Sequence, residues 1–100
     1  MPDLTSKQRA YLRSLAHSLK PIIQVGNEGA SEAVVKTIRE AFNTRELLKI
    51  KVLESAPEDA RTTADGIVKG LEGVHVAQTI GRTVVLYRAF EEDPEIKLPG

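Results

Sequence analysis

The segment ELLKIKVLE, residues 46–54, alternates between apolar and polar side chains and predicts a β-strand with one apolar face. The opposite face carries Leu47, Lys49 and Lys51. A strand of this kind needs apolar segments elsewhere in the chain to cover it. Because the helical segments offer no other apolar surface of comparable size, we expect their apolar stripes to pack on one layer of sheet.

Helical spacing of apolar residues recurs in three segments, residues 5–17, 30–43 and 55–71. A residue suited to N-capping stands near each start. Thr5 or Ser6 is the candidate for the first segment and Ser31 for the second. Ser55 is the candidate for the third, with Pro57 in the first turn, where proline is tolerated.

Three further strands are predicted, over residues 22–25, 74–80 and 83–90. Gly81 and Arg82 separate the last two and indicate a tight hairpin. The order is helix, strand, helix, strand, helix, strand, strand, which indicates a single α/β domain with a mixed four-stranded sheet covered by helices. We expect this domain to span residues 1–90. Residues 91–100, the acidic tail, are expected to be irregular or loosely packed, with no patterned core face.

The charge is balanced overall but unevenly distributed. The chain of 100 residues has 14 basic and 14 acidic side chains, and four of the acidic ones lie in the acidic tail. Residues 1–89 hold 13 basic against 10 acidic side chains, a net charge of +3. This pattern is typical of a mildly basic body that presents a local positive patch. Ordinary solvated surface charge explains the same numbers, so charge alone leaves both interpretations open.

No catalytic or metal-binding set is evident in the sequence. There are no cysteines, and the two histidines, His17 and His75, lie in no local motif with an acid, a base and a nucleophile. We therefore expect no enzymatic activity, no metal, no cofactor and no small-molecule substrate. No apolar run has the length of a signal peptide core or a membrane span, so the expected location is the cytoplasm, away from membranes.

The sequence GNEG, residues 26–29, stands between a predicted strand and a predicted helix. Two glycines at this position leave the backbone open near the positive end of a helix dipole, which suits a phosphate. RNA-binding KH domains clamp the sugar-phosphate backbone with a loop of this form. Plain turn formation also explains two glycines, so this glycine loop is a weak signal by itself. Its candidate contact residues are Gly26, Asn27, Glu28 and Gly29.

Basic residues elsewhere in the chain are candidates for a surface that attracts phosphates around the glycine loop. They are Arg9, Arg13, Lys20, Lys49, Lys51, Arg82 and Arg88. Arg9 and Arg13 are one helical step apart and share a face. Each of these residues is equally compatible with a solvated helix face or a polar strand face.

Several ordered motifs together give a more specific signal. They are Lys-Gln-Arg at 7–9, Ala-His-x-Leu-Lys-Pro at 16–21, the glycine loop, Glu-Leu-x-Lys-x-Lys-Val at 46–52 and Ile-Gly-x-x-x-Val-Leu-Tyr-Arg at 80–88. With these motifs the chain resembles the bacterial YhbY family, a stand-alone CRM domain (chloroplast RNA splicing and ribosome maturation). The resemblance covers about residues 5–88.

The resemblance implies an α/β domain similar to the C-terminal domain of a bacterial translation initiation factor. It also implies RNA binding through the glycine loop and adjacent basic surface, with ribosomal RNA and the precursor of the large ribosomal subunit as partners. The expected function is therefore a non-enzymatic RNA-binding protein that assists ribosome assembly. The alternative is a protein-interaction module on ribosomal particles without its own RNA affinity, which fits the neutral net charge and the acidic tail.

One residue departs from the family pattern. Loops of this family generally have polar, often basic, residues between the glycines, whereas Glu28 brings a negative charge to the proposed phosphate site. At a helix entrance Glu28 has a second use as a partner of the helix dipole. Its effect on RNA depends on whether its side chain points toward the ligand or away from it.

Overall fold

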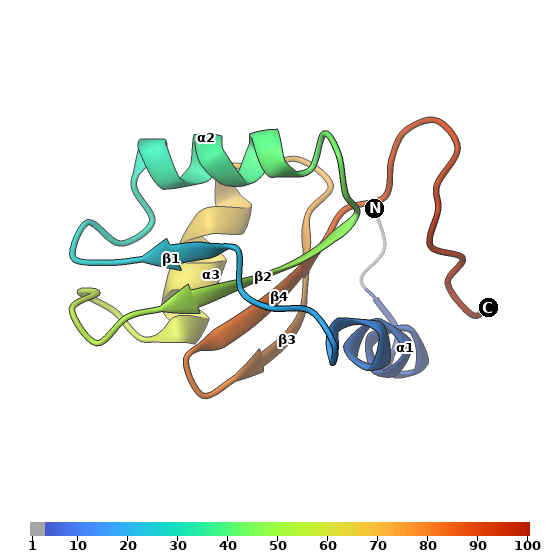
Figure 1. Ribbon diagram of the computed structural model, residues 1–100, viewed down its shortest axis with the longest axis horizontal. Coiled ribbons are helices and arrows are strands. Elements are labelled where there is room, and N and C mark those ends of the chain that lie inside the picture. The colour runs from blue at the N-terminus through green and yellow to red at the C-terminus, as the bar shows by residue number, and fades with distance from the viewer. Residues whose placement is uncertain (1–3) are drawn as a thin grey trace.

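The strand predicted over residues 46–54 lies inside the sheet as β2, between β1 and β4. The computed structural model describes residues 4–100, which form one four-stranded sheet with helices on both faces (Figure 1). The elements in chain order are α1 (Ser6–Ala16), β1 (Ile23–Val25), α2 (Glu32–Ala41), β2 (Leu47–Val52), α3 (Ala60–Lys69), β3 (His75–Ile80) and β4 (Thr83–Tyr87). This order confirms the predicted α/β architecture.

The sheet is mixed, with strand order β1-β2-β4-β3. β1 and β2 are parallel, and α2 forms the crossover between them, whereas β2 with β4 and β3 with β4 are antiparallel. The predicted hairpin connects β3 to β4 through Gly81, whose φ of +57° lies in the region that favours glycine. β1 and β3 are therefore the two edge strands.

The larger core lies between the sheet and the pair α2 and α3. The apolar face of β2 packs there, with Leu48, Ile50 and Val52 all buried. Ile38 from α2 and Ile67 from α3 are the fully buried helical counterparts. The apolar face of β2 and the apolar stripes of α2 and α3 thus pack together on one face of the sheet, as the sequence predicts.

A smaller core lies on the opposite face, where α1 packs. Leu12 and Ala16 of α1 contact the cluster that contains Leu47, Val85 and Tyr87. These strand residues lie toward the start of β2 and the end of β4. The helix therefore covers this end of the sheet face and leaves the other end, which leads to the glycine loop, without a helical cover (Figure 1).

The acidic tail is held against this smaller core. It contains no helix or strand, as predicted, and two of its residues, Ile96 and Leu98, are half-buried and pack against the core. The carboxylate of Glu46, which is only 4% exposed, accepts hydrogen bonds from the backbone N–H groups of Phe90, Glu95 and Ile96 at 2.7 to 2.8 Å. A buried side chain in the middle of the chain therefore fixes the course of its last residues.

The third helix begins later than the sequence predicts. The Asp59 carboxylate accepts a hydrogen bond from the Thr62 N–H at 2.8 Å and forms the N-cap of α3. Asp59 is as good a cap as serine, so the helix starts at Ala60. Ser55, the predicted cap, and Pro57 remain in the loop that follows β2.

Candidate nucleic-acid interface

The glycine loop connects β1 to α2, and its turn is closed by a hydrogen bond from the Gly29 N–H to the Gly26 carbonyl oxygen at 2.9 Å. Gly29 has a φ of +63°, a conformation that other residues rarely adopt. Gly29 is also buried, and a Cβ atom there would lie 3.1 Å from Cγ of Pro57. Gly29 is therefore required by the shape of the loop, and it faces the protein.

The solvent side of the loop is formed by the residues before Gly29. Asn27 and Glu28 are exposed, and Gly26 is half-buried. A Cβ atom at Gly26 would lie 3.7 Å from Oγ of Ser55, an ordinary contact. The surface that the loop offers to a ligand thus consists of Gly26, Asn27 and Glu28, and the charge of Glu28 lies at its exposed tip.

The loop leads into the first turn of α2. The Ser31 side chain accepts a hydrogen bond from the Val34 N–H at 3.3 Å, which confirms Ser31 as the N-cap. Glu32, in the first turn, already places a negative charge at the positive end of the helix. Ser31 therefore occupies one of the free N–H groups of the helix, and Glu32 offsets part of the positive charge of the helix end. Attraction of a phosphate then depends on cations that lie beside the loop.

Three loops meet at this end of the molecule. The Leu53 N–H donates to the Val25 carbonyl oxygen at 2.9 Å and joins the start of the loop after β2 to the end of β1. The Val52 N–H donates to the Arg82 carbonyl oxygen at 2.7 Å, which brings the hairpin alongside. The Arg82 guanidinium forms a salt bridge of 3.3 Å with the exposed Glu54. Arg82 therefore lies near the glycine loop, but Glu54 offsets its charge.

The uncovered part of the sheet borders this end. In the strand register Gln24 lies beside Lys51, Lys51 opposite Thr83, and Thr83 opposite Ile80, so these residues form one row across all four strands. We call this row the open row. Lys51 is exposed in the open row, and Gln24 precedes the first residue of the glycine loop by two positions. The predicted lysine face of β2 and the glycine loop therefore form one continuous surface.

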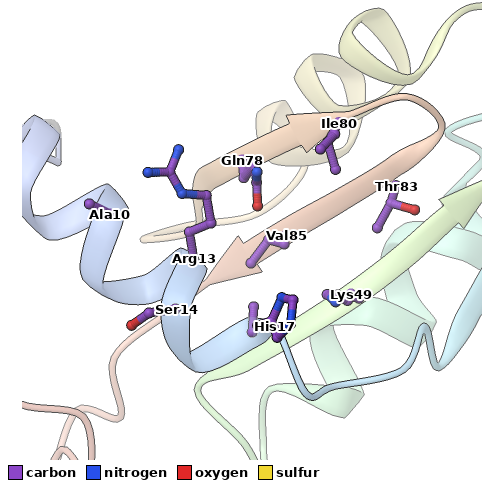
Figure 2. A pocket seen from close by; sticks show the side chains of 10 residues that line it. Ala10, Arg13, Ser14, His17, Lys49, Gln78, Ile80, Thr83 and Val85 are labelled. Carbon is purple, nitrogen blue, oxygen red and sulfur yellow. The ribbon is translucent and has the colours of Figure 1, made fainter.

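The adjacent row forms the floor of a groove beneath α1, which Figure 2 shows. In this row Lys49 lies opposite Val85, and Val85 lies opposite Gln78. The groove has a volume of about 680 Å³, and Arg13 of α1 lines its opposite wall. The Lys49 ammonium donates a hydrogen bond to the Leu19 carbonyl oxygen at 3.0 Å, so Lys49 also holds the segment that joins α1 to β1.

The remaining predicted residues lie at different distances from this surface. Lys20 is exposed in the segment after α1, one residue beyond the carbonyl that Lys49 contacts. Arg9 lines a separate hollow beside β3, together with Arg61 of α3. Arg88 lies at the far end of β4, where its N–H donates to the Glu46 carbonyl oxygen at 2.9 Å. The structure thus places Lys51 and Arg82 at the end of the sheet that carries the glycine loop, and Arg13 and Lys49 in the groove beneath α1 with Lys20 nearby. It separates Arg9 and Arg88 from both groups.

Three residues that line the groove or the separate hollow beside β3 were not predicted. His17 lines the groove, and its position four residues after Arg13 is the signal that places both on one side of α1. Arg61 joins Arg9 only through the packing of α1 and α3 around β3. Gln78 reaches the groove because of an irregularity in the register of β3, for which the sequence has no marker.

Within residues 4–100, no three histidine, cysteine, aspartate or glutamate side chains form a group that could hold a metal ion. No helix in the same range is long and apolar enough to cross a membrane.

The comparisons with known proteins agree on the family. The family model of the CRS1/YhbY (CRM) domain matches residues 4–88. The chain is 46% identical to "Probable RNA-binding protein YqeI" of Bacillus subtilis, over 96% of this chain and 99% of that protein. It is 39% identical to an "RNA-binding protein" of Haemophilus influenzae, over 99% and 98% of the two chains. The solution structure of SAV1595 from Staphylococcus aureus superposes with a TM-score of 0.80 at 40% identity, covering 96% of this chain and 99% of that one. The chain belongs to the CRS1/YhbY (CRM) domain family.

Proposed function

We propose that this protein is a non-catalytic RNA-binding protein that associates with precursors of the large ribosomal subunit and assists their assembly. The names of its relatives in Bacillus subtilis and Haemophilus influenzae support RNA binding. The ribosomal partner follows from the resemblance to the YhbY family. Ribosomal RNA is therefore the proposed ligand, and the cytoplasm, where ribosomes assemble, is the proposed location.

One observation carries the proposal: Lys51 is exposed on the open row, directly beside the strand that leads into the glycine loop. A lysine in this position neutralises a phosphate while the backbone around Gly26 approaches the next part of the RNA strand. Lys49, Arg13 and Lys20 extend the positive charge along the same side. The surface is basic locally although the chain as a whole has no net charge.

The surface favours recognition of RNA shape and backbone. Bases that stack on a protein usually do so on exposed aromatic rings. The open row carries no aromatic residue, and Phe42 and Tyr87 are each only 4% exposed. Contacts to phosphates and sugars therefore provide most of the proposed affinity, as they do in proteins that recognise RNA by its shape.

The salt dependence of binding tests this surface. We expect Lys51→Ala to reduce the slope of log affinity against log salt by about 1, because one phosphate contact is lost. Lys36→Ala is the matched control, since Lys36 is an exposed lysine on α2, which covers the other face of the sheet. Equal slopes for Lys51→Ala and the wild type would remove the open row from the interface.

The ribosomal partner needs a separate test in cells. We expect ultraviolet crosslinking followed by sequencing of the attached RNA to recover large-subunit ribosomal RNA together with its unprocessed ends. Crosslinks spread evenly over messenger RNA and transfer RNA would contradict the ribosomal assignment and leave RNA binding itself intact.

A protein-interaction module remains the second candidate because α1 exposes an apolar stripe. Tyr11 and Leu15 of α1, and Leu19 in the segment after the helix, are spaced by four residues and are 36% to 38% exposed. An exposed helical stripe of this kind is typical of a contact with another protein. Nuclease treatment of isolated particles distinguishes the candidates: retention of the protein on residual ribosomal proteins favours this module, and release with the digested RNA favours the RNA-binding function.

A further inference from the structure

A β-bulge in β3 determines which residues of that strand line the groove beneath α1. Val76 pairs with Leu86 and Gln78 pairs with Val85, so Ala77 is an extra residue without a partner in β4. In a regular strand, residues 76 and 78 would face the same side of the sheet. Val76 packs on the core beneath α2 and α3, whereas the bulge turns Gln78 to the opposite face.

The same shift changes the side on which Ile80 lies. Ile80 pairs with Thr83, which shares a sheet face with Val85, and so Ile80 projects from the groove side. It is 60% exposed, the largest exposure among the large apolar residues of the part of the chain that the structure describes. The bulge therefore places an amide and an unburied apolar side chain next to each other in the same groove (Figure 2).

Basic side chains line the groove from α1 and from β2. Arg13 extends from α1 over the sheet, and His17 and Lys49 lie at the other end of the groove (Figure 2). Among residues 4–100, no carboxylate lines the groove. Val85 lies beneath the groove and is fully buried, so the apolar surface that the groove exposes comes from Ile80. The groove thus combines positive charge, a hydrogen-bonding amide and apolar surface in a volume of about 680 Å³.

This combination matches the parts of one nucleotide. Arginine and lysine pair with a phosphate, an exposed apolar side chain such as Ile80 accepts the face of a base, and a glutamine amide both donates and accepts hydrogen bonds at a base edge. The volume lies in the range of about 300–1,000 Å³ that is typical of small-molecule sites. A base inside a continuous duplex is stacked between its neighbours, so only an unpaired nucleotide presents its face to such a groove.

We propose that the groove between α1 and the β3–β4 hairpin binds a single unpaired nucleotide of the RNA. The base lies against Ile80, Gln78 reads the base edge, and Arg13 holds the phosphate. The inference rests on the proposed RNA-binding function and adds the RNA feature that the surface selects. Because the groove adjoins the open row, the strand that follows the bound nucleotide leads to Lys51 and on to the glycine loop.

Two hairpin RNAs of equal duplex length, one fully paired and one with a single bulged nucleotide, provide the test. The wild-type protein is expected to bind the bulged hairpin at least about fivefold more tightly, an effect comparable to one net hydrogen bond. Gln78→Ala should lose this preference and keep its affinity for the paired hairpin, and Ile80→Ala should lose the preference as well. Thr79→Ala is the control, because Thr79 pairs with Val84 and lies outside the groove.

The outcomes separate the groove from the wider function. Equal wild-type affinity for the two hairpins overturns the nucleotide site and leaves RNA binding standing, whereas absence of affinity for either RNA overturns both. A preference that survives both groove substitutions also overturns the site. Loss of particle association in Ile80→Ala with unchanged RNA affinity would assign the groove to a protein partner instead.

A photoreactive base at the bulge gives an independent readout that does not depend on variant folding. Crosslinking through 4-thiouridine at the bulged position, followed by peptide mapping, is expected to label peptides that contain Gln78 or Arg13. Labelling confined to the glycine loop would overturn the proposed position of the base.

Discussion

The carboxylate of Glu46 accepts a hydrogen bond from the backbone N–H of Ile96 at 2.7 Å, across fifty residues of sequence. The same side chain accepts from Phe90 and Glu95, so one buried residue just before β2 determines where the acidic tail lies. The tail is thereby fixed on the α1 side of the sheet, where Ile96 and Leu98 complete the smaller core.

Glu46→Ala should reduce the free energy of unfolding by about 2–3 kcal/mol, because hydrogen bonds to a charged acceptor are lost and their donors remain without a partner. Denaturant unfolding measures this loss, and hydrogen exchange should show faster exchange of the amides at 90, 95 and 96. Glu91→Gln, a change in an exposed acidic residue of the tail, is the control and should be neutral. Unchanged exchange in Glu46→Ala would contradict the role of Glu46.

The two loop glycines should respond differently to alanine. Gly29→Ala is expected to destabilise the protein by roughly 1–2 kcal/mol, since alanine is strained at positive φ and its Cβ would crowd Pro57. Gly26→Ala should fold normally, because its Cβ would make only an ordinary contact of 3.7 Å with Oγ of Ser55, and it should weaken RNA binding by adding bulk to the half-buried backbone of the loop. Thermal unfolding and RNA titration of both variants measure the two effects. Equal stability of Gly29→Ala and the wild type would contradict the packing role of Gly29.

Glu28 lies exposed at the tip of the glycine loop, so its charge opposes the approach of a phosphate. Glu28→Lys should therefore bind RNA several-fold more tightly at low salt and steepen the slope of log affinity against log salt by up to about 1. Glu28→Gln should give an intermediate affinity. An affinity that does not change in either variant would show that the tip of the loop stays away from the RNA.

The pKa of the Tyr87 phenol is raised above its ordinary value of 10.0, first by burial and second by the negative charge of Glu46. The neutral phenol is therefore favoured in the folded state. This contribution to stability is complete below the ordinary pKa and is lost as the pH rises through the raised pKa. Tyr87→Phe should accordingly flatten the fall in stability above about pH 10, as measured by urea unfolding. Parallel profiles of the two proteins would contradict the burial of a titrating phenol.

The pKa of the Asp59 carboxyl is lowered below its ordinary value of 3.8, chiefly by the hydrogen bond from the Thr62 backbone N–H. Its contribution to stability is present above the ordinary pKa and is lost as the pH falls through the lowered pKa. At neutral pH, Asp59→Ala should lower the melting temperature by removing the cap of α3. Asp59→Asn should keep most of the stabilisation, because asparagine is also a good N-cap. A melting temperature for Asp59→Asn as low as that of Asp59→Ala would show that the charge, rather than the cap, matters.

The sequence predicts most of the fold because its patterns are local. The alternation in β2 places Lys49 and Lys51 on one face, and the structure confirms that face. The capping residue Ser31 and the hairpin at Gly81 also act within a few neighbouring residues. The start of α3 was misplaced because two capping residues, Ser55 and Asp59, compete within one helical turn, and local rules rank them alike.

The relation of the basic residues to one another depends on packing. Arg9 and Arg13 share a face of α1 in the sequence, yet Arg13 lines the groove and Arg9 the hollow beside β3. Arg88 follows a strand whose other end carries Arg82, so the length of β4 separates the two charges. The distances between these basic side chains depend on the order and direction of the strands in the sheet. The pattern of residues along the sequence does not specify that order or direction.

By itself, the sequence determines the element order, the lysine face of β2 and the position of the glycine loop, because periodicity and turn chemistry act between near neighbours. The tertiary structure alone decides that Gly29 packs beneath Pro57, that Glu46 binds the tail and that a bulge turns Gln78 into the groove. Each of these depends on atoms far apart in the chain. These contacts form only when the sheet and the helices on its two faces have packed together.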